Sequence, residues 1–483
     1  MTHDGILRPC SFRLGVEGWA LTTHLKAGPV LARARAANAL RTESCVFLGP
    51  DDEHPPGQPR VRLVQGEARA VFTGADGAHA SDGRSRMALG PARHVALASE
   101  HRRARLALAD GEGIALGDWP ALGDDELAVP HALRRTPVSR SDVQVLEMGL
   151  SGDRVLVLYG LPDPVLGVLY VGPDDVRDVR LRLPAPVRHV DVEWVGEQVG
   201  VALRLDTGQS MGCVLDARGS TRVKPYLLLG GRADGSTPRV LWAERGFKVA
   251  VPCASDGSVR VVSMGATGEP ELVVEEAAGP MDAVYFAQRY YFAAVHEAED
   301  AATLLLRSVE QDGGGTQTLS CSVWPSQATG RLRLRVLRDR LRGLAAELRG
   351  VGYRSTAGQA TDVHLDGTTL NVKGPAGDSG AITSAVELRV AVGPEGDALV
   401  VRWRAPVAFE EPSFPRVRRV LGIDRPLSPL EEEQLAALRA SVPHRQESVE
   451  ADPRGWEVRF QLTELPDTIR LAGAVRSLLL TGA

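Results

Sequence analysis

The string Gly377-Asp378-Ser379-Gly380 is the sharpest chemical signal in the sequence. Such a string can present a nucleophilic serine, with backbone N–H groups of the glycine and serine forming an oxyanion hole. The serine would need a histidine base. A base of this kind is expected within an alanine-alanine-histidine-cysteine string, and none of the eleven histidines lies in such a string. Because glycine, aspartate and serine also form turns, we interpret the string as a turn. Ser379 is the one candidate catalytic residue, for a serine hydrolase.

A second group of side chains could bind a metal ion. His296, Glu297 and Glu299 are close together directly after an apolar run. The second histidine of an H-E-x-x-H motif is missing, so two imidazoles would not share one helical face. We interpret the group as a polar hairpin tip and expect no bound metal, with these three residues as the candidate ligands in the alternative.

Six arginines occur within twelve residues, and Asp339 is the only acid among them. They are Arg331, Arg333, Arg335, Arg338, Arg340 and Arg342. Aromatic residues are not interleaved with them, which argues against a nucleic-acid surface. A solvated helix face is the favoured interpretation, and an acidic protein partner contacting Arg335, Arg338 and Arg342 is the alternative.

Other chemical patterns are weak. The carboxylates of Asp174-Asp175 and of Asp124-Asp125-Glu126 have no matched acid or base at a recognisable spacing. The sequence has no G-x-x-x-x-G-K-[ST] string and no G-x-G-x-x-G between a strand and a helix, so we expect no nucleotide and no other cofactor.

The elements that would position these residues recur along the first two thirds of the chain. Short runs rich in valine and leucine are separated by glycine, aspartate and proline, and no helical periodicity competes with them. The runs fall into triplets whose middle members begin at residues 105, 155, 199, 248 and 290, a spacing of 42 to 50 residues. Four strands with their turns need about 40 to 50 residues, which is the length of a propeller blade.

This pattern predicts an all-β propeller over residues 1–325, with six or seven blades. Two of its middle strands, 155–159 and 290–295, are almost continuously apolar, as expected of strands buried on both faces. Runs between residues 10 and 72 would supply one or two more blades, interrupted by a polar stretch at 74–86. We expect the segment 316–323 to close the ring by joining the first blade.

Over residues 8–325 the chain resembles the WD40/YVTN-like β-propeller superfamily in architecture. No Gly-His…Trp-Asp pair, kelch double glycine or Asp-box repeats at fixed positions, so the resemblance implies a fold and no binding residues. A pair of β-sandwiches or an irregular barrel is the alternative.

After Pro325 the pattern changes to a small α+β sandwich domain, 326–483. Apolar residues at steps of three and four predict a helix ending near Gly350, and Val336 belongs to its apolar set. Ser428-Pro429-Leu430-Glu431 predicts a capped helix start, and a final helix should turn Ile469 inward. The expected order is α-β-β-β-α-β-β-α, which resembles YbjN and type III secretion chaperone-like domains; this resemblance implies protein binding.

Composition sets the remaining limits. The 483 residues are 43% hydrophobic, enough for packed cores, and no apolar run of membrane-spanning length occurs. The net charge of −5 suggests neither a nucleic-acid nor a membrane partner, and five scattered cysteines suggest no disulfide framework. We therefore expect a cytoplasmic protein.

Two classes of function follow. The first is a non-enzymatic protein-interaction scaffold or regulatory subunit of a bacterial multi-protein system, with defence as a hypothetical context, because a rigid ring of loops suits binding. The second is a hydrolase with its site at the mouth of the propeller channel. Three or more Asp, Glu or His side chains converging there would favour the hydrolase.

Overall fold

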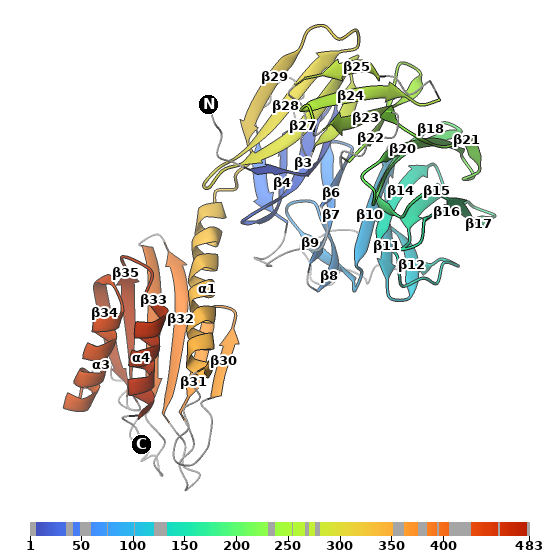
Figure 1. The fold of residues 1–483 in the computed structure, drawn as a ribbon. Helices are drawn as coiled ribbons and strands as arrows, with labels where there is room; N and C mark the ends of the chain where they lie inside the picture. Colours follow the sequence, from blue (N-terminus) through green and yellow to red (C-terminus); the bar gives the residue numbers. More distant parts are fainter. Residues whose placement is uncertain are drawn as a thin grey trace. The chain divides into compact units, whose positions relative to one another are not determined.

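The computed structural model describes residues 6–34, 42–48, 59–74, 76–100, 102–119, 133–229, 237–253, 255–265, 270–275, 281–350, 362–374, 384–393, 396–404, 427–452 and 455–480. The chain divides into two compact units, Met1–Ser326 and Gln327–Ala483 (Figure 1). No helix within the described ranges is long and apolar enough to cross a membrane.

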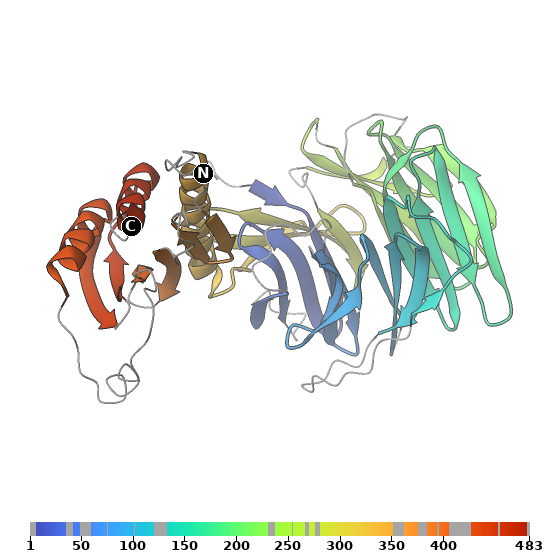
Figure 2. The same ribbon diagram turned by 90° about the horizontal axis from the view of Figure 1, so that it is seen from below.

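The first unit is a seven-bladed β-propeller. Its described strands form six four-stranded sheets and one five-stranded sheet, all antiparallel (Figures 1 and 2). Blade one contains β2 (Cys10–Gly15), β3 (Gly18–Leu25), β4 (Gly28–Ala34) and β5 (Ser44–Phe47). Blade two contains β6 (Arg60–Val64), β7 (Glu67–Gly74), β8 (Gly77–Ser81) and β9 (Arg86–Gly90). Blade three contains β10 (His94–Glu100), β11 (Arg103–Asp110), β12 (Gly113–Asp118) and β13 (Arg134–Arg135).

The later blades repeat this meander. Blade four contains β14 (Val145–Ser151), β15 (Arg154–Gly160), β16 (Val165–Val171) and β17 (Val176–Arg182). Blade five contains β18 (Val187–Val195), β19 (Gln198–Leu205), β20 (Ser210–Asp216) and β21 (Thr221–Leu227). Blade six contains β22 (Arg239–Ala243), β23 (Gly246–Cys253), β24 (Ser258–Ser263) and β25 (Pro270–Val274). Blade seven contains β26 (Asp282–Phe286), β27 (Arg289–Glu297), β28 (Ala302–Glu310) and β29 (Gln317–Ser322).

The ring is closed by the N-terminal strand. β1 (Ile6–Arg8) pairs with the end of β27, so that Ile6 lies opposite Glu297, and it extends the edge of β27 that β26 occupies further along. Inner strands β2 and β26 are in contact, as are the inner strands of every other neighbouring pair of blades. The predicted closure by residues 316–323 is wrong, because β29 pairs with β28 as the outer strand of blade seven.

Apolar packing between neighbouring blades holds the ring together. One buried cluster joins Leu156 and Val168 of blade four to Val201 and Leu215 of blade five, and similar clusters join other neighbours. The second and third strands supply most of these residues, whereas outer strands such as β17 and β21 are largely exposed. The predicted polar interruption at 74–86 is wrong in part, since it contains β8, all of whose five residues are buried.

The second unit is a six-stranded antiparallel sheet with helices on one face (Figure 2). Its elements are α1 (Ala328–Gly350), β30 (Asp362–Asp366), β31 (Thr369–Lys373), β32 (Ala385–Gly393), β33 (Gly396–Arg404), α3 (Pro429–Ser441), β34 (His444–Asp452), β35 (Gly455–Leu462) and α4 (Thr468–Leu480). The sheet order is β30-β31-β32-β33-β35-β34, and the helices bury their leucines against it.

Details of this unit both confirm and correct the predictions. The capping box at Ser428 and Glu431 is present, with Pro429 at the first helical position. The described residues between α1 and α3 form four strands, β30 to β33, so the predicted count of three is wrong. Val336 and Ile469 were expected to face inward, but they are exposed, by 46% and 68% respectively.

Candidate functional site

The inner strands of the propeller line a central channel, where eight charged side chains of the described residues gather. They are Arg13, Arg60, Arg62, Glu147, Asp191, Glu193, Arg239 and Asp282. A cavity of about 280 Å³ opens among them, lined by residues from all seven inner strands. Its lining residues lie toward the ends of those strands that turn into the second strands, so the cavity occupies the channel on that side. We call it the channel cavity.

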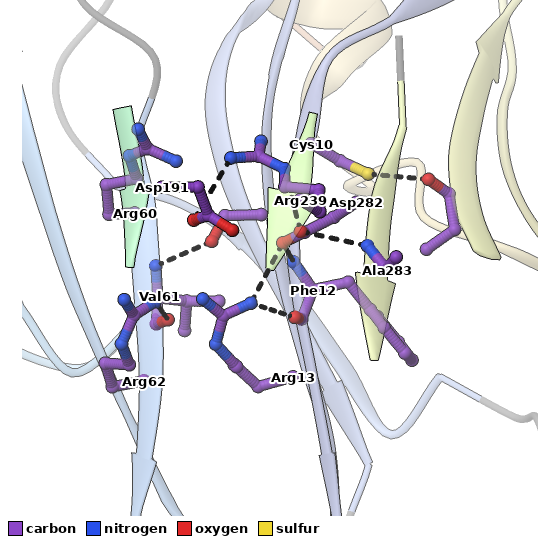
Figure 3. Close-up of polar contacts among 12 residues, drawn as sticks. Cys10, Phe12, Arg13, Arg60, Val61, Arg62, Asp191, Arg239, Asp282 and Ala283 are labelled. Carbon is purple, nitrogen blue, oxygen red and sulfur yellow. Dashed lines mark hydrogen bonds and ion pairs between the residues drawn. The ribbon is translucent and has the colours of Figure 1, made fainter. Parts of the chain in front are cut away.

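Asp282 accepts more contacts than any other carboxylate of this group. Its Oδ2 lies 2.8 Å from the backbone nitrogen of Phe12 and 3.0 Å from Nη1 of Arg13, both on β2. Its Oδ1 lies 3.0 Å from the backbone nitrogen of Ala283 and 3.0 Å from Nε of Arg239 (Figure 3). Burial would raise the pKa of Asp282, but Arg239, Arg13 and the Phe12 N–H together lower it. Asp282 is therefore an ionised link between blades six, seven and one.

Arg239 lies between two buried aspartates (Figure 3). Besides Asp282, its Nη1 is 3.5 Å from Oδ1 of Asp191, whose Oδ2 accepts a 2.7 Å hydrogen bond from the backbone of Val240. Burial raises the pKa of Asp191, and Asp282 raises it further, while Arg239 lowers it in part. His189 accepts from Arg239 across 3.0 Å, and burial with the nearby arginines holds the pKa of His189 well below its usual value, so its imidazole is neutral.

Glu147 of blade four faces two arginines of blade two. Its Oε2 is 3.2 Å from Arg60, whereas its Oε1 is 3.8 Å from Nη2 of Arg62, too far for a hydrogen bond. Arg62 donates one hydrogen bond, at 3.1 Å, to the backbone oxygen of Val61. Burial, with help from Arg13, lowers the pKa of Arg62 to about 10. Arg62 therefore remains charged at neutral pH. Most of its N–H donors make no hydrogen bond to a described protein atom.

Glu193 is the remaining carboxylate of the cavity. It is exposed to the cavity, and among the described residues it has no hydrogen bond and no ion pair. Partial desolvation by the surrounding inner strands raises the pKa of Glu193, although Arg13 and Arg62 oppose this effect. It is the available acid of the site.

Aromatic side chains form part of the cavity wall. Trp194, Trp242 and Tyr285 come from three successive blades, and each is half-buried. The indole nitrogen of Trp194 donates to the backbone oxygen of Gly196, at 2.9 Å, which fixes the ring. Half-buried aromatic rings around a polar floor are typical of ligand and partner sites.

The nearby thiol is not a nucleophile. Cys10 is fully buried, donates to the backbone oxygen of Ala293 and has its pKa raised to about 12 by burial. No set of three or more histidine, cysteine, aspartate or glutamate side chains in the described part of the chain could hold a metal ion.

The predicted metal candidates have other roles. Glu297 is 1% exposed, forms a 2.6 Å ion pair with Arg8 on β1 and accepts a 2.7 Å hydrogen bond from the backbone of Lys26. The interpretation of this segment as a solvated tip is therefore wrong for Glu297, which holds the closing strand. His296 is half-buried beside it on β27, and only Glu299 lies in the exposed turn.

The other predicted residues are not brought to the channel cavity lining. Arg335 and Arg338 are half-buried on α1, and Arg342 is exposed and pairs with Asp339 at 3.0 Å. Ser379 lies outside the described residues, as do residues 124–126. The acid Asp175 pairs with Arg177 at 2.9 Å.

The channel residues were missed at the level of sequence, although a signal for them exists. The first strands of five blades each carry a charged residue in or next to an apolar run; these residues are Arg60, Glu147, Asp191, Arg239 and Asp282. Aligning the first strands on the turn that follows each of them places these charges in one layer around the channel.

Comparisons with known proteins find distant similarity to solved structures and no match by sequence. No family model matches the sequence, and no curated protein matches it. A prolyl endopeptidase structure is 10% identical, with a TM-score of 0.41; the match covers 82% of this chain, which spans 54% of that enzyme's length. The β-propeller domain of Swd1 from Myceliophteria thermophila is 10% identical over 64% of this chain and 95% of its own, with a TM-score of 0.41. The six-bladed fucose lectin of Aleuria aurantia is 8% identical over 56% and 96%, with a TM-score of 0.35. The chain is a β-propeller protein by its own sheet topology.

Proposed function

We propose that this protein is a non-enzymatic interaction scaffold whose propeller binds a partner at the channel cavity. The proposal is supported by the way in which the charged side chains of the channel are paired. Asp282, Asp191 and Arg239 are committed to one another and to backbone N–H groups of neighbouring blades. They make a rigid floor, and rigid, preorganised surfaces bind at lower entropic cost.

The alternative function is a hydrolase, for which three or more acidic or histidine side chains should converge at the channel. Asp191, Glu193 and Asp282 do converge on the cavity. Acid–base catalysis by a carboxylate pair needs two groups that can reach substrate. Both oxygens of Asp191 and of Asp282 already have partners, which leaves Glu193 alone. This occupancy supports binding over hydrolysis.

The proposal is tested by affinity capture from the native cell. The full chain should return a specific protein at near-equal amounts. The double substitution Trp194→Ala and Trp242→Ala removes two walls of the cavity and should abolish capture, because aromatic residues dominate interface energies. Trp119→Ala is the matched control: this half-buried tryptophan stacks against Arg69, 5.3 Å away, and is not part of the cavity wall.

Four results would contradict the proposal. Equal capture by the double variant would place the partner elsewhere, and absence of any partner would remove the scaffold. Turnover of a hydrolysable substrate that is lost in Glu193→Gln would make the protein an enzyme. For the serine-hydrolase alternative, a fluorophosphonate probe should not label the full chain, and stoichiometric labelling lost in Ser379→Ala would establish it.

A further inference from the structure

We propose that the channel cavity binds a carboxylate group, which the guanidinium of Arg62 holds beside the side chain of Glu193. The inference rests on the proposed function in one respect: in a scaffold, the carboxylate is an acidic side chain of the partner. A free organic acid is the other source of the same chemistry, and the experiment below separates the two.

Arg62 has the open donors that such a ligand needs. A guanidinium carries five N–H donors, and the fork they form matches a carboxylate. Among the described residues Arg62 uses one hydrogen bond, to the Val61 oxygen, and Glu147 stands 3.8 Å away. Arg13, by contrast, is engaged by Asp282 and by the Phe12 oxygen. Of the two arginines that line the cavity, Arg62 is the one left to recognise a ligand.

Charge balance favours a single negative charge. The channel holds four arginines and four carboxyl groups, which sum to zero when all are ionised. When Glu193 takes up a proton, one positive charge is in excess, and one carboxylate neutralises it. A phosphate group brings about two negative charges. It would leave an excess of negative charge beside Asp191 and Asp282, so a carboxylate suits the cavity better.

Desolvation by the surrounding inner strands raises the pKa of Glu193, which favours its protonated form. Arg13 on β2 and Arg62 on β6 favour its ionised form, and Asp191 on its own strand opposes it. Further charges on the neighbouring inner strands are Glu147 on β14, Arg239 on β22 and Asp282 on β26. A carboxylate next to Glu193 is a like charge and raises the pKa of Glu193 further. Ligand binding therefore takes up a proton, and by linkage the ligand binds more tightly at lower pH.

The apolar walls of the cavity favour a carboxylate that is attached to an apolar group. Trp194, Trp242 and Tyr285, with Leu241 and Val284, present apolar surface to the cavity. A flat or aliphatic body attached to the carboxylate would cover this surface. We therefore choose benzoylglycine as a probe, because it joins one carboxylate to an aromatic ring, and benzoylglycinamide as its uncharged match.

The test is calorimetric titration of the full chain with each probe at pH 5.5 and pH 8. Benzoylglycine should bind more tightly at pH 5.5, and the amide should not bind. Arg62→Gln should weaken binding by about tenfold or more, the usual effect of losing a charged hydrogen bond. Glu193→Gln keeps a donor in place but cannot titrate, so its affinity for benzoylglycine should be the same at pH 5.5 and pH 8. Arg182→Gln, on the exposed strand β17, should change nothing.

The results of these experiments test the carboxylate site and the scaffold function separately. Equal binding of acid and amide, no binding of either, or full binding by Arg62→Gln overturns the inference. If Arg62→Gln does not fold, an unchanged pH dependence in Glu193→Gln overturns it. A protein partner that is lost with Trp194→Ala and Trp242→Ala but fully retained by Arg62→Gln leaves the scaffold standing and rejects the carboxylate. Benzoylglycine binding without any protein partner supports the carboxylate with a free acid as its source and rejects the scaffold.

Discussion

Asp282, on the inner strand of blade seven, accepts a 2.8 Å hydrogen bond from the backbone nitrogen of Phe12, on the inner strand of blade one. These residues are 270 positions apart in the chain, and their contact spans the seam where the ring closes. On the next strand outward, Arg8 and Glu297 join β1 to the same blade. The first and last segments of the propeller are thus held by buried polar contacts in addition to apolar packing.

Replacing Asp282 with asparagine should therefore destabilise the propeller. The substitution leaves Arg239 and Arg13 without the charge they face, and breaking a buried pair typically costs about 3 to 5 kcal/mol. Urea unfolding of the full chain would measure the loss in the free energy of unfolding. Asp118→Asn, which removes an exposed carboxylate paired with Arg105, is the control and should change stability by less than about 1 kcal/mol.

The same residue predicts a pH dependence. The pKa of Asp282 is lower in the folded protein than its ordinary value, so its contribution is fully present above the unfolded value of about 3.9. That contribution disappears as the pH falls through the folded pKa. The stability difference between the parent and Asp282→Asn should thus shrink with acid below pH 4. A difference that stays constant as the pH falls below 4 would show that folding does not lower the pKa of Asp282.

Val249→Asp should unfold the propeller. Val249 is fully buried on β23, between Val240 and Val262 of the adjacent strands. An unpaired charge there costs several kcal/mol against a total stability of about 5 to 15 kcal/mol. Circular dichroism melting would detect it, with the exposed Val176 of β17 changed to aspartate as the control. If both variants melt like the parent, the position of Val249 between packed sheets is incorrect.

How far the sequence predicted the structure depended on how apolar each strand is. The run Tyr290–Val295 was recognisable because both of its faces pack against neighbouring blades. The outer strands β17 and β21 were missed, since their exposed positions carry arginine, aspartate and lysine and resemble loops. β8 was missed because Gly77–Ser81 is built from small residues, which pack well but carry little hydrophobic signal.

The contacts among the charged side chains of the channel could not be predicted from single residues, for a different reason. Asp191 and Asp282 are separated by 91 positions, and only the curvature of the ring places Arg239 between them. Local patterns cannot report such a contact. The same holds for Glu297, which reads as part of an acidic turn until β1 brings Arg8 to it.

The C-terminal unit should fold by itself. Residues 327–483 contain their own core, in which α1, α3 and α4 pack on the six-stranded sheet around Trp403, Trp456 and Phe460. An isolated fragment should unfold cooperatively in urea when it is followed by tryptophan fluorescence. A gradual, non-cooperative transition would mean that the propeller supplies part of this core.

The arginines of α1 provide a second predicted contact with an acidic partner. Arg335 and Arg342 are seven residues apart and so lie on the same face of the helix. Changing both to glutamate should reduce recovery of an acidic partner and leave the melting temperature unchanged. Arg340→Glu, on a different face, is the control. Unaltered recovery in the double variant would exclude this helix from the interface.

Site-specific photo-crosslinking shows directly whether a partner protein contacts the channel cavity. A benzoylphenylalanine in place of Tyr285 puts the reactive group in the wall of the channel cavity, and the same residue in place of Leu227 puts it on the exposed outer strand β21. After irradiation in the native cell, we expect one dominant protein adduct from position 285 and none from position 227. Adducts from position 227 alone, or equal adducts from both positions, would contradict binding at the channel cavity.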